Sequence, residues 1–323
     1  MRYILRRLIF AALLVFVVSS GALLLARLAP GDITSETFGT GATREAIARE
    51  RARYGLDRPI ADQYFGWLSR AVRFDLGTSM MFNGRPVAGL VRERAANTAL
   101  LALVALVLAT AIGLPLGVVA GSRRGGVVPS LIRGTSLVLL SLPPLLTSIV
   151  FVFIAARTRW LPLGGMTSID AMDAGWWERA ADMLWHLPVP ALALALPIAA
   201  TLERLQAQAM AEAVKEPCIL AAFGRGVPRG RLIWRDALRL AGRPVASVYG
   251  LIIGGLLSGS FVVEIVTAWP GLGRLMYDAL RSRDLYLVAG CATAGAVFLA
   301  AGSLLSDLAL AVVDPRVRGD GER

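Results

Sequence analysis

The sequence predicts an all-α membrane protein with six transmembrane helices. Its hydrophobic fraction of 56% and its mean hydropathy of +0.61 are high, since soluble domains contain roughly 45–50% apolar residues. Charged residues fall mainly between long apolar windows, and a membrane-spanning helix needs about 20 mostly apolar residues. Six windows meet or approach this requirement, at residues 8–28, 98–120, 134–156, 187–201, 245–266 and 285–313.

The first window follows an arginine-rich start and could be mistaken for a secretory signal peptide. Its apolar run is longer than the usual signal-peptide core of about 7–15 residues, and five more windows follow it. We therefore expect an uncleaved first transmembrane helix. Arg27 lies near its outer end, where a long side chain can extend to the lipid headgroups.

Residues 29–97 form the one long polar stretch of the chain. Charges alternate over residues 44–53 in a helix-compatible pattern, and Tyr64, Phe65 and Trp67 indicate a second amphipathic helix after Pro59. We expect a helical extracytoplasmic subdomain inserted between the first two transmembrane helices. Residues 1–97 would then form an N-terminal region with one span, and residues 98–323 a core with five.

Prolines distinguish the third and fourth windows. Pro143 and Pro144 lie in the middle of the third, where they break the helical hydrogen-bond ladder. Discontinuous membrane helices are tolerated where they line a cavity or pack on protein, so a role in a solute pathway and a purely structural kink both remain open. The fourth window is short and contains three prolines, which makes it the weakest of the six.

The fifth window carries a small-residue face made by Gly250, Gly254, Gly255 and Gly259. Close helix packing is the more general use of such a face. A pore lining that includes Gly255 and Gly259 is the sharper alternative.

Two acids lie within the last two windows. An acid inside a membrane span is a functional candidate by default, and Glu264 near the outer end of the fifth window is one such residue. We favour a helix-end carboxylate satisfied by neighbouring groups for Glu264, and a structural role for Asp307 in the sixth window.

The arginines set the expected orientation. With the N-terminus in the cytoplasm, the cytoplasmic segments are residues 1–7, 121–133, 202–244 and 314–323. These segments carry 17 Lys and Arg against seven Asp and Glu, which is ten of the eleven net positive charges. This excess is the positive-inside pattern and places both termini on the cytoplasmic side of the cell inner membrane. It also argues against nucleic-acid binding, which would concentrate basic residues on a soluble module.

Several kinds of chemistry are disfavoured. His186 is the single histidine, and Cys218 and Cys291 are isolated. We therefore expect no catalytic residues, no cofactor, no metal site and no disulfide framework. The G-x-x-x-x-G-K-[ST] motif of nucleotide-binding loops is absent from the sequence. His186 is most simply an interfacial residue beside Trp185.

The loop at residues 202–244 contains the most informative segment. Pro217 suits the first position of a short helix, Glu216 before it favours the positive helix end, and Gly226 can end the helix in a left-handed conformation. Such a helix would present mainly apolar side chains, so it needs a surface to pack on. That surface is either the ends of the protein's own helices or another subunit.

The stretch Ala221-Ala222-x-x-x-Gly226 resembles the E-A-A-x-x-x-G loop of ABC importer permeases. Its continuation through residue 244 is similar to the dipeptide/oligopeptide/nickel branch of that family. The sequence departs from the pattern at Leu220, in place of the eponymous glutamate, and at Phe223, Gly224 and Asp236. Further similar segments occur in the family's order at residues 28–32, 54–59, 74–79, 141–144, 160–165, 259–264, 269–274, 283–284 and 314–316.

This resemblance implies a type I importer permease whose coupling helix contacts a cytoplasmic ABC ATPase subunit. The coupling loop would comprise Cys218, Ile219, Leu220, Ala221, Ala222, Phe223, Gly224, Arg225 and Gly226. Pathway or gating residues would come from Pro143, Pro144, Gly255, Gly259 and Glu264. Further implied partners are a second permease, either homologous or identical, an extracytoplasmic solute-binding protein and the lipid bilayer.

The implied function is translocation of peptides or similar small solutes, with nickel, opines and glutathione as other possible cargoes. ATP hydrolysis would then take place on a partner chain. A secondary transporter or channel is the alternative; it predicts charged residues deep in several spans or inverted repeats, and only Glu264 and Asp307 fit. An intramembrane enzyme would need a catalytic set that the single histidine does not provide.

Overall fold

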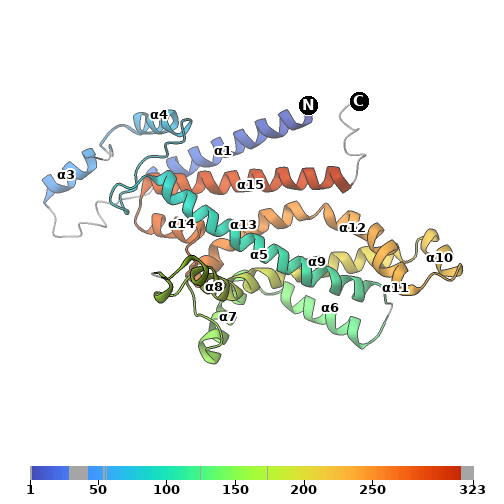
Figure 1. Ribbon diagram of the computed structural model, residues 1–323. Coiled ribbons are helices and arrows are strands. Elements are labelled where there is room, and N and C mark those ends of the chain that lie inside the picture. The colour runs from blue at the N-terminus through green and yellow to red at the C-terminus, as the bar shows by residue number, and fades with distance from the viewer. Residues whose placement is uncertain are drawn as a thin grey trace. The chain divides into compact units, whose positions relative to one another are not determined.

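The computed structural model describes residues 2–28, 43–53, 55, 57–123, 125–172 and 174–313. Its regular structure there is helical, apart from one isolated bridge between Thr78 and Pro86. The helices, shown in Figure 1, are α1 (Arg2–Leu28), α3 (Arg44–Arg53), α4 (Ile60–Ala71), α5 (Val87–Gly121), α6 (Val127–Leu140), α7 (Pro144–Thr158), η2 (Asp170–Met172), α8 (Trp176–His186), α9 (Pro188–Ala213), α10 (Pro217–Gly224), α11 (Arg229–Arg231), η3 (Leu232–Ala237), α12 (Leu238–Ala246), α13 (Tyr249–Val266), α14 (Leu272–Arg281) and α15 (Leu285–Val313). The all-α prediction is confirmed.

Five continuous helices of the described chain are long and apolar enough to cross a membrane, and the number is six if a bent pair of helices is counted as one span. The continuous ones are Leu5–Leu28, α5, α9, α13 and Leu285–Leu304. The pair is α6 and α7, which meet at an angle of 104°. The expected third helix is therefore not continuous, because Pro143 and Pro144 cannot donate the backbone hydrogen bonds that would carry α6 onward.

Two helices are longer than their apolar windows. Helix α5 begins at Val87, before the window predicted from residue 98. Helix α9 continues to Ala213, well beyond the predicted end at residue 201, so the first part of the expected 202–244 loop is helical. The polar residues that extend these two helices beyond the apolar windows are compatible with helix formation. They end the apolar window but do not end the helix.

The contacts divide the chain into two compact units. One comprises residues 1–99 and 270–301, and the other comprises residues 100–269 and 302–323. The expected division between residues 97 and 98 separates the first span and the polar insertion from the core with five spans. It stays a prediction.

The first unit joins the helices of the polar insertion to α14 and the start of α15. Trp67 of α4 is buried with Leu23 of α1 and with Val87 of α5 in one apolar cluster. The Ser20 hydroxyl lies 3.0 Å from the Tyr64 hydroxyl, which joins α1 to α4. The two helices expected in the insertion are present, as α3 and α4.

The second unit is built around α9. Helix α5 packs on it through small residues: a Cβ added to Gly113 would lie 2.5 Å from the Ala199 carbonyl oxygen, and one added to Gly117 would lie 2.6 Å from that of Glu203. Helix α7 contacts α9 through the Thr147 hydroxyl, which donates a 2.9 Å hydrogen bond to the Ala193 carbonyl. In Figure 1, α8 and α10 lie at opposite ends of α9.

Some sequence predictions fall outside the described residues. They concern residues 29–32, Tyr54, Leu56, residues 314–316 and the surroundings of the Asp307 side chain.

Candidate functional site

Helix α10 is the short helix that the sequence predicts after residue 216. Glu216 precedes it with an extended backbone, and Pro217 occupies its first turn. At the other end Gly226 has a φ of +83°, in the left-handed region. The Gly226 N–H donates to the Phe223 carbonyl at 3.0 Å and the Val227 N–H donates to the Ala222 carbonyl at 3.2 Å. This pair of bonds is the Schellman motif, which satisfies carbonyls left free at a helix end.

One residue attaches α10 to the rest of its unit. Ile219 is only 8% exposed, and it belongs to an apolar cluster with Val118, Met210, Ala213, Ala237 and Ala241. That cluster combines the ends of α5 and α9 with η3 and α12. Ile219 therefore packs directly against the ends of α5 and α9.

The rest of α10 presents an apolar surface. Leu220 is 57% exposed and Phe223 is 61% exposed, and Cys218 is exposed beside them. Large apolar side chains at adjacent exposed positions are typical of a surface that another protein covers. The helix thus packs on its own chain through Ile219, which is one of the two surfaces considered from the sequence. Leu220 and Phe223 remain available for the other, a second subunit.

A cavity of about 540 Å³ lies between the loop after α5 and the segment after α10. It is lined by Val118, Val119, Ser122, Arg123, Gly125, Arg229, Gly230, Ile233 and Trp234. Trp234 is half exposed, at 51%. In the sequence, the loop after α5 stands out only by its positive charge. No local pattern in residues 121–126 indicates that the loop lies beside residue 234.

The residues predicted to form a pathway are only partly brought together. Pro143 precedes α7 with an extended backbone and Pro144 begins the helix. A Cβ added to Gly259 of α13 would lie 3.7 Å from Pro144 Cγ and 3.8 Å from Leu194 Cδ2 of α9. Gly259 therefore lies at a contact of three helices, whereas Gly255 has nothing within 4 Å of its added Cβ.

Glu264 is completely buried and has an interaction partner. Its role in a pathway stays a prediction, as do the roles of the prolines and glycines.

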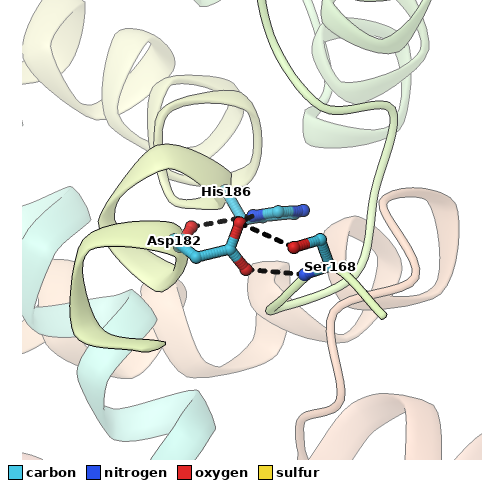
Figure 2. Close-up of polar contacts among 3 residues, drawn as sticks. All are labelled: Ser168, Asp182 and His186. Atoms are coloured by element: carbon cyan, nitrogen blue, oxygen red, sulfur yellow. Dashed lines mark hydrogen bonds and ion pairs between the residues drawn. The ribbon is translucent and has the colours of Figure 1, made fainter. Parts of the chain in front are cut away.

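The single histidine belongs to a local polar cluster, shown in Figure 2. The Asp182 carboxylate accepts hydrogen bonds from the Ser168 N–H at 2.6 Å and from the Ser168 hydroxyl at 3.0 Å. His186 Nδ1 lies 2.8 Å from the Asp182 carbonyl oxygen. The aspartate thus lies between the other two residues, whereas a hydrolytic triad needs the histidine in the middle.

The neighbours of Asp182 stabilise its charged form, as expected for a structural contact. The hydrogen bond from the Ser168 N–H is the main cause that lowers the pKa of the Asp182 carboxyl, with the Ser168 hydroxyl and His186 acting in the same direction against burial. Among the described residues, no group of three His, Cys, Asp or Glu side chains is arranged to hold a metal ion.

Comparison with known proteins identifies the family to which the chain belongs. Residues 113–319 match the model of the family described as binding-protein-dependent transport system inner membrane component, and residues 1–106 match the model of its N-terminal part. The chain belongs to this family. The resemblance drawn from the coupling loop and the ordered segments is confirmed.

Relatives within the inner membrane component family match over almost the whole chain. The chain is 32% identical to a probable peptide ABC transporter permease, y4tP of Sinorhizobium fredii, over 98% of its length and 99% of the relative's. It is 30% identical to the oligopeptide transport system permease AppB of Bacillus subtilis, over 98% of both chains. It is 32% identical to OppB of Mycobacterium tuberculosis, over 98% of this chain and 99% of the relative. As an inner membrane component, the chain is a transport subunit of an ABC importer.

Proposed function

We propose that α10 is the surface through which this permease receives a cytoplasmic ATPase subunit. The observation that supports this most strongly is the division of roles within α10: Ile219 packs in the protein's own cluster, while Leu220 and Phe223 remain exposed. Burying a Leu or Phe side chain is worth about 1.5–3 kcal/mol. A groove on the ATPase that covers both would therefore hold α10 firmly enough to move it.

Energy for transport then comes from the partner chain. The sequence contains no nucleotide-binding loop, so ATP is hydrolysed on the ATPase subunits. Their association would displace α10, and the Ile219 cluster would pass this displacement to the ends of α5 and α9. A ligand or partner that binds one conformation better shifts the population toward it, which is the basis of alternating access.

The proposed cargo is a peptide or a similar small solute delivered by a binding protein. Three relatives at 30–32% identity carry names that specify peptides or oligopeptides. Selection among peptides, nickel, opines and glutathione would rest mainly with the binding protein.

The proposed orientation places both termini and α10 in the cytoplasm. The four segments assigned to that side carry ten of the eleven net positive charges, and basic residues near span ends favour the cytoplasmic side. Helix α8 and the insertion with α3 and α4 would then lie on the outer side.

A second permease, homologous or identical, would complete the pathway. Helix α13 meets the bent pair where Gly259 approaches Pro144, and we propose that this junction, with Gly255 and Glu264 on the same helix, moves during gating. Irregular backbone within a membrane is tolerated where it lines a cavity or packs on protein.

The coupling proposal is tested by Phe223→Asp and Gly226→Pro. Asp at residue 223 puts a charge into the proposed contact, and Pro at residue 226 is incompatible with a φ of +83°. Both variants should lose co-purification with the ATPase subunits and peptide uptake. Val72→Asp, at another exposed apolar residue, which follows α4, is the control for the added charge and should keep both. Uptake and ATPase coupling that survive both substitutions in α10 would refute the proposal.

A further inference from the structure

Helix α8 carries an apolar stripe on its exposed side. Trp177 is 69% exposed, Leu184 is 63% exposed and Trp185 is 57% exposed. Together with Ala181 these residues occupy positions i, i+4, i+7 and i+8, so they share one face of the helix. Glu178 and Arg179 lie outside this stripe, which contains no charged side chain.

Toward the C-terminal end of α8, the opposite side carries Asp182, Met183 and His186 and faces protein. His186 is buried, and Asp182 is fixed by two hydrogen bonds to Ser168. Figure 2 shows the three side chains of this cluster together. A helix that faces water on its outer side carries polar residues there, whereas the outer side of α8 carries two tryptophans and a leucine.

Helix α8 is joined directly to a membrane span. It ends at His186, and α9 begins at Pro188, so only the buried residue Leu187 separates them. The end of α8 must consequently lie where α9 reaches the membrane boundary. Tryptophan is enriched at this depth, because its ring is apolar while its N–H can bond to water or headgroups.

We propose that α8 lies in the membrane–water interface, with Trp177, Leu184 and Trp185 inserted among the phospholipids. The partner of this face is the lipid at the boundary between headgroups and acyl chains, which binds amphipathic helices through their apolar side. The Ser168–Asp182 contact prevents α8 from rotating this face away. Because Leu187 joins α8 to α9, the contact of α8 with lipid also holds one end of α9. The other end of α9 leads to α10.

The position of α8 can be measured by lipid quenching of tryptophan fluorescence. The full chain is reconstituted in vesicles whose phosphatidylcholine is brominated near the headgroup end of the acyl chains. The double variant Trp177→Phe/Trp185→Phe removes two of the seven tryptophans, and the quenched share of the remaining emission should fall. Trp234→Phe, at a residue with similar exposure in the segment after α10, is the control and should raise that share.

Aqueous iodide gives the complementary measurement. It should quench a larger share of the emission in the double variant than in the wild type, since the two removed tryptophans lie out of its reach. If the double substitution instead lowers the share quenched by iodide and does not lower the share quenched by lipid, the face is in water and the proposal is wrong. If a purified binding protein removes that iodide quenching, the face is a protein-docking surface, which also overturns the proposal.

A second measurement needs no variant. A phospholipid with a diazirine near its headgroup is photoactivated in vesicles that hold the native chain, and labelled peptides are identified by mass spectrometry. Labelling should appear in the peptide with residues 176–186 as well as in α1. A labelled α1 with an unlabelled α8 would contradict the proposal even if the tryptophan variants fail to fold.

Discussion

The Ser79 hydroxyl donates a hydrogen bond of 2.6 Å to Oδ2 of Asp284, a residue 205 positions further along the chain. The Met81 N–H donates to the same oxygen at 3.1 Å, and the Leu287 N–H donates to Oδ1 at 3.2 Å. The carboxylate is completely buried. It therefore joins the polar insertion to the start of α15 within the first compact unit, and it also caps that helix.

Removing this carboxylate should destabilise the chain. We expect Asp284→Ala to lower the free energy of unfolding by about 2–4 kcal/mol, because each buried donor left without an acceptor costs about 1–3 kcal/mol. Ser79→Ala removes one donor and should cost less. Thermal unfolding in detergent checks both, with the exposed Asp57→Ala as control. Equal transition temperatures for Asp284→Ala and the control would show that the contact contributes no stability.

The approach of α5 to α9 depends on the absence of side chains. Gly113→Ala would bring a methyl group to 2.5 Å from the Ala199 carbonyl oxygen, so we expect a loss of about 1–3 kcal/mol from overpacking. Gly134→Ala in α6 has open space around its added Cβ. It should be neutral or gain up to about 1 kcal/mol through helix propensity. The unfolding curve of Gly113→Ala should therefore shift to lower stability, while that of Gly134→Ala stays unchanged or shifts to higher stability; equal shifts would contradict the close approach.

Acid should weaken the attachment of α8. The folded-state pKa of Asp182 is lowered from 3.8, so its contribution to stability is present above pH 3.8 and is lost as the pH falls through the lower folded value. Asp182→Asn should lower the unfolding temperature at neutral pH and remove this acid-dependent part. Ser168→Ala should keep most of it, because the main cause is the backbone N–H. The measurement is unfolding temperature against pH, and identical profiles for wild type and Asp182→Asn would contradict it.

The orientation is tested by the side from which cysteines react. Cys218 is exposed in α10, and Val72→Cys introduces a thiol at an exposed residue in the insertion. A membrane-impermeant maleimide should label residue 72 from the outside and Cys218 only from the cytoplasmic face. Labelling of Cys218 in intact cells would reverse the topology.

Much of this structure follows from patterns that a single sequence contains. Apolar windows locate the five continuous candidate spans and the bent pair, and Pro217 and Gly226 locate the start and end of α10. The angle between α6 and α7 does not follow from the two prolines, because it depends on the packing of α7 on α9 through Thr147. Helix α9 is underestimated for a related reason: Glu203 and Arg204 end the apolar window, yet Glu203 is buried in the continuing helix.

Long-range contacts are the other part that patterns leave out. Gly113, Gly117 and Gly121 are spaced four residues apart and indicate a close helix contact, but nothing local identifies α9 as the partner. The Ser168–Asp182 contact likewise depends on how a loop folds back. The sequence also does not show which residue of α10 is covered by the rest of the chain. That residue is Ile219, and its burial determines which side of α10 is exposed.

The central claim, that α10 contacts the ATPase, is tested most directly on the native cysteine of that helix. Cys218 is exposed, whereas Cys291 is buried, so maleimide labelling of the folded chain reports on α10. The labelling rate of Cys218 is measured for the permease alone and in complex with its ATPase subunits. Rapid labelling is expected for the permease alone and strong protection in the complex. Equal rates in the two samples would contradict it.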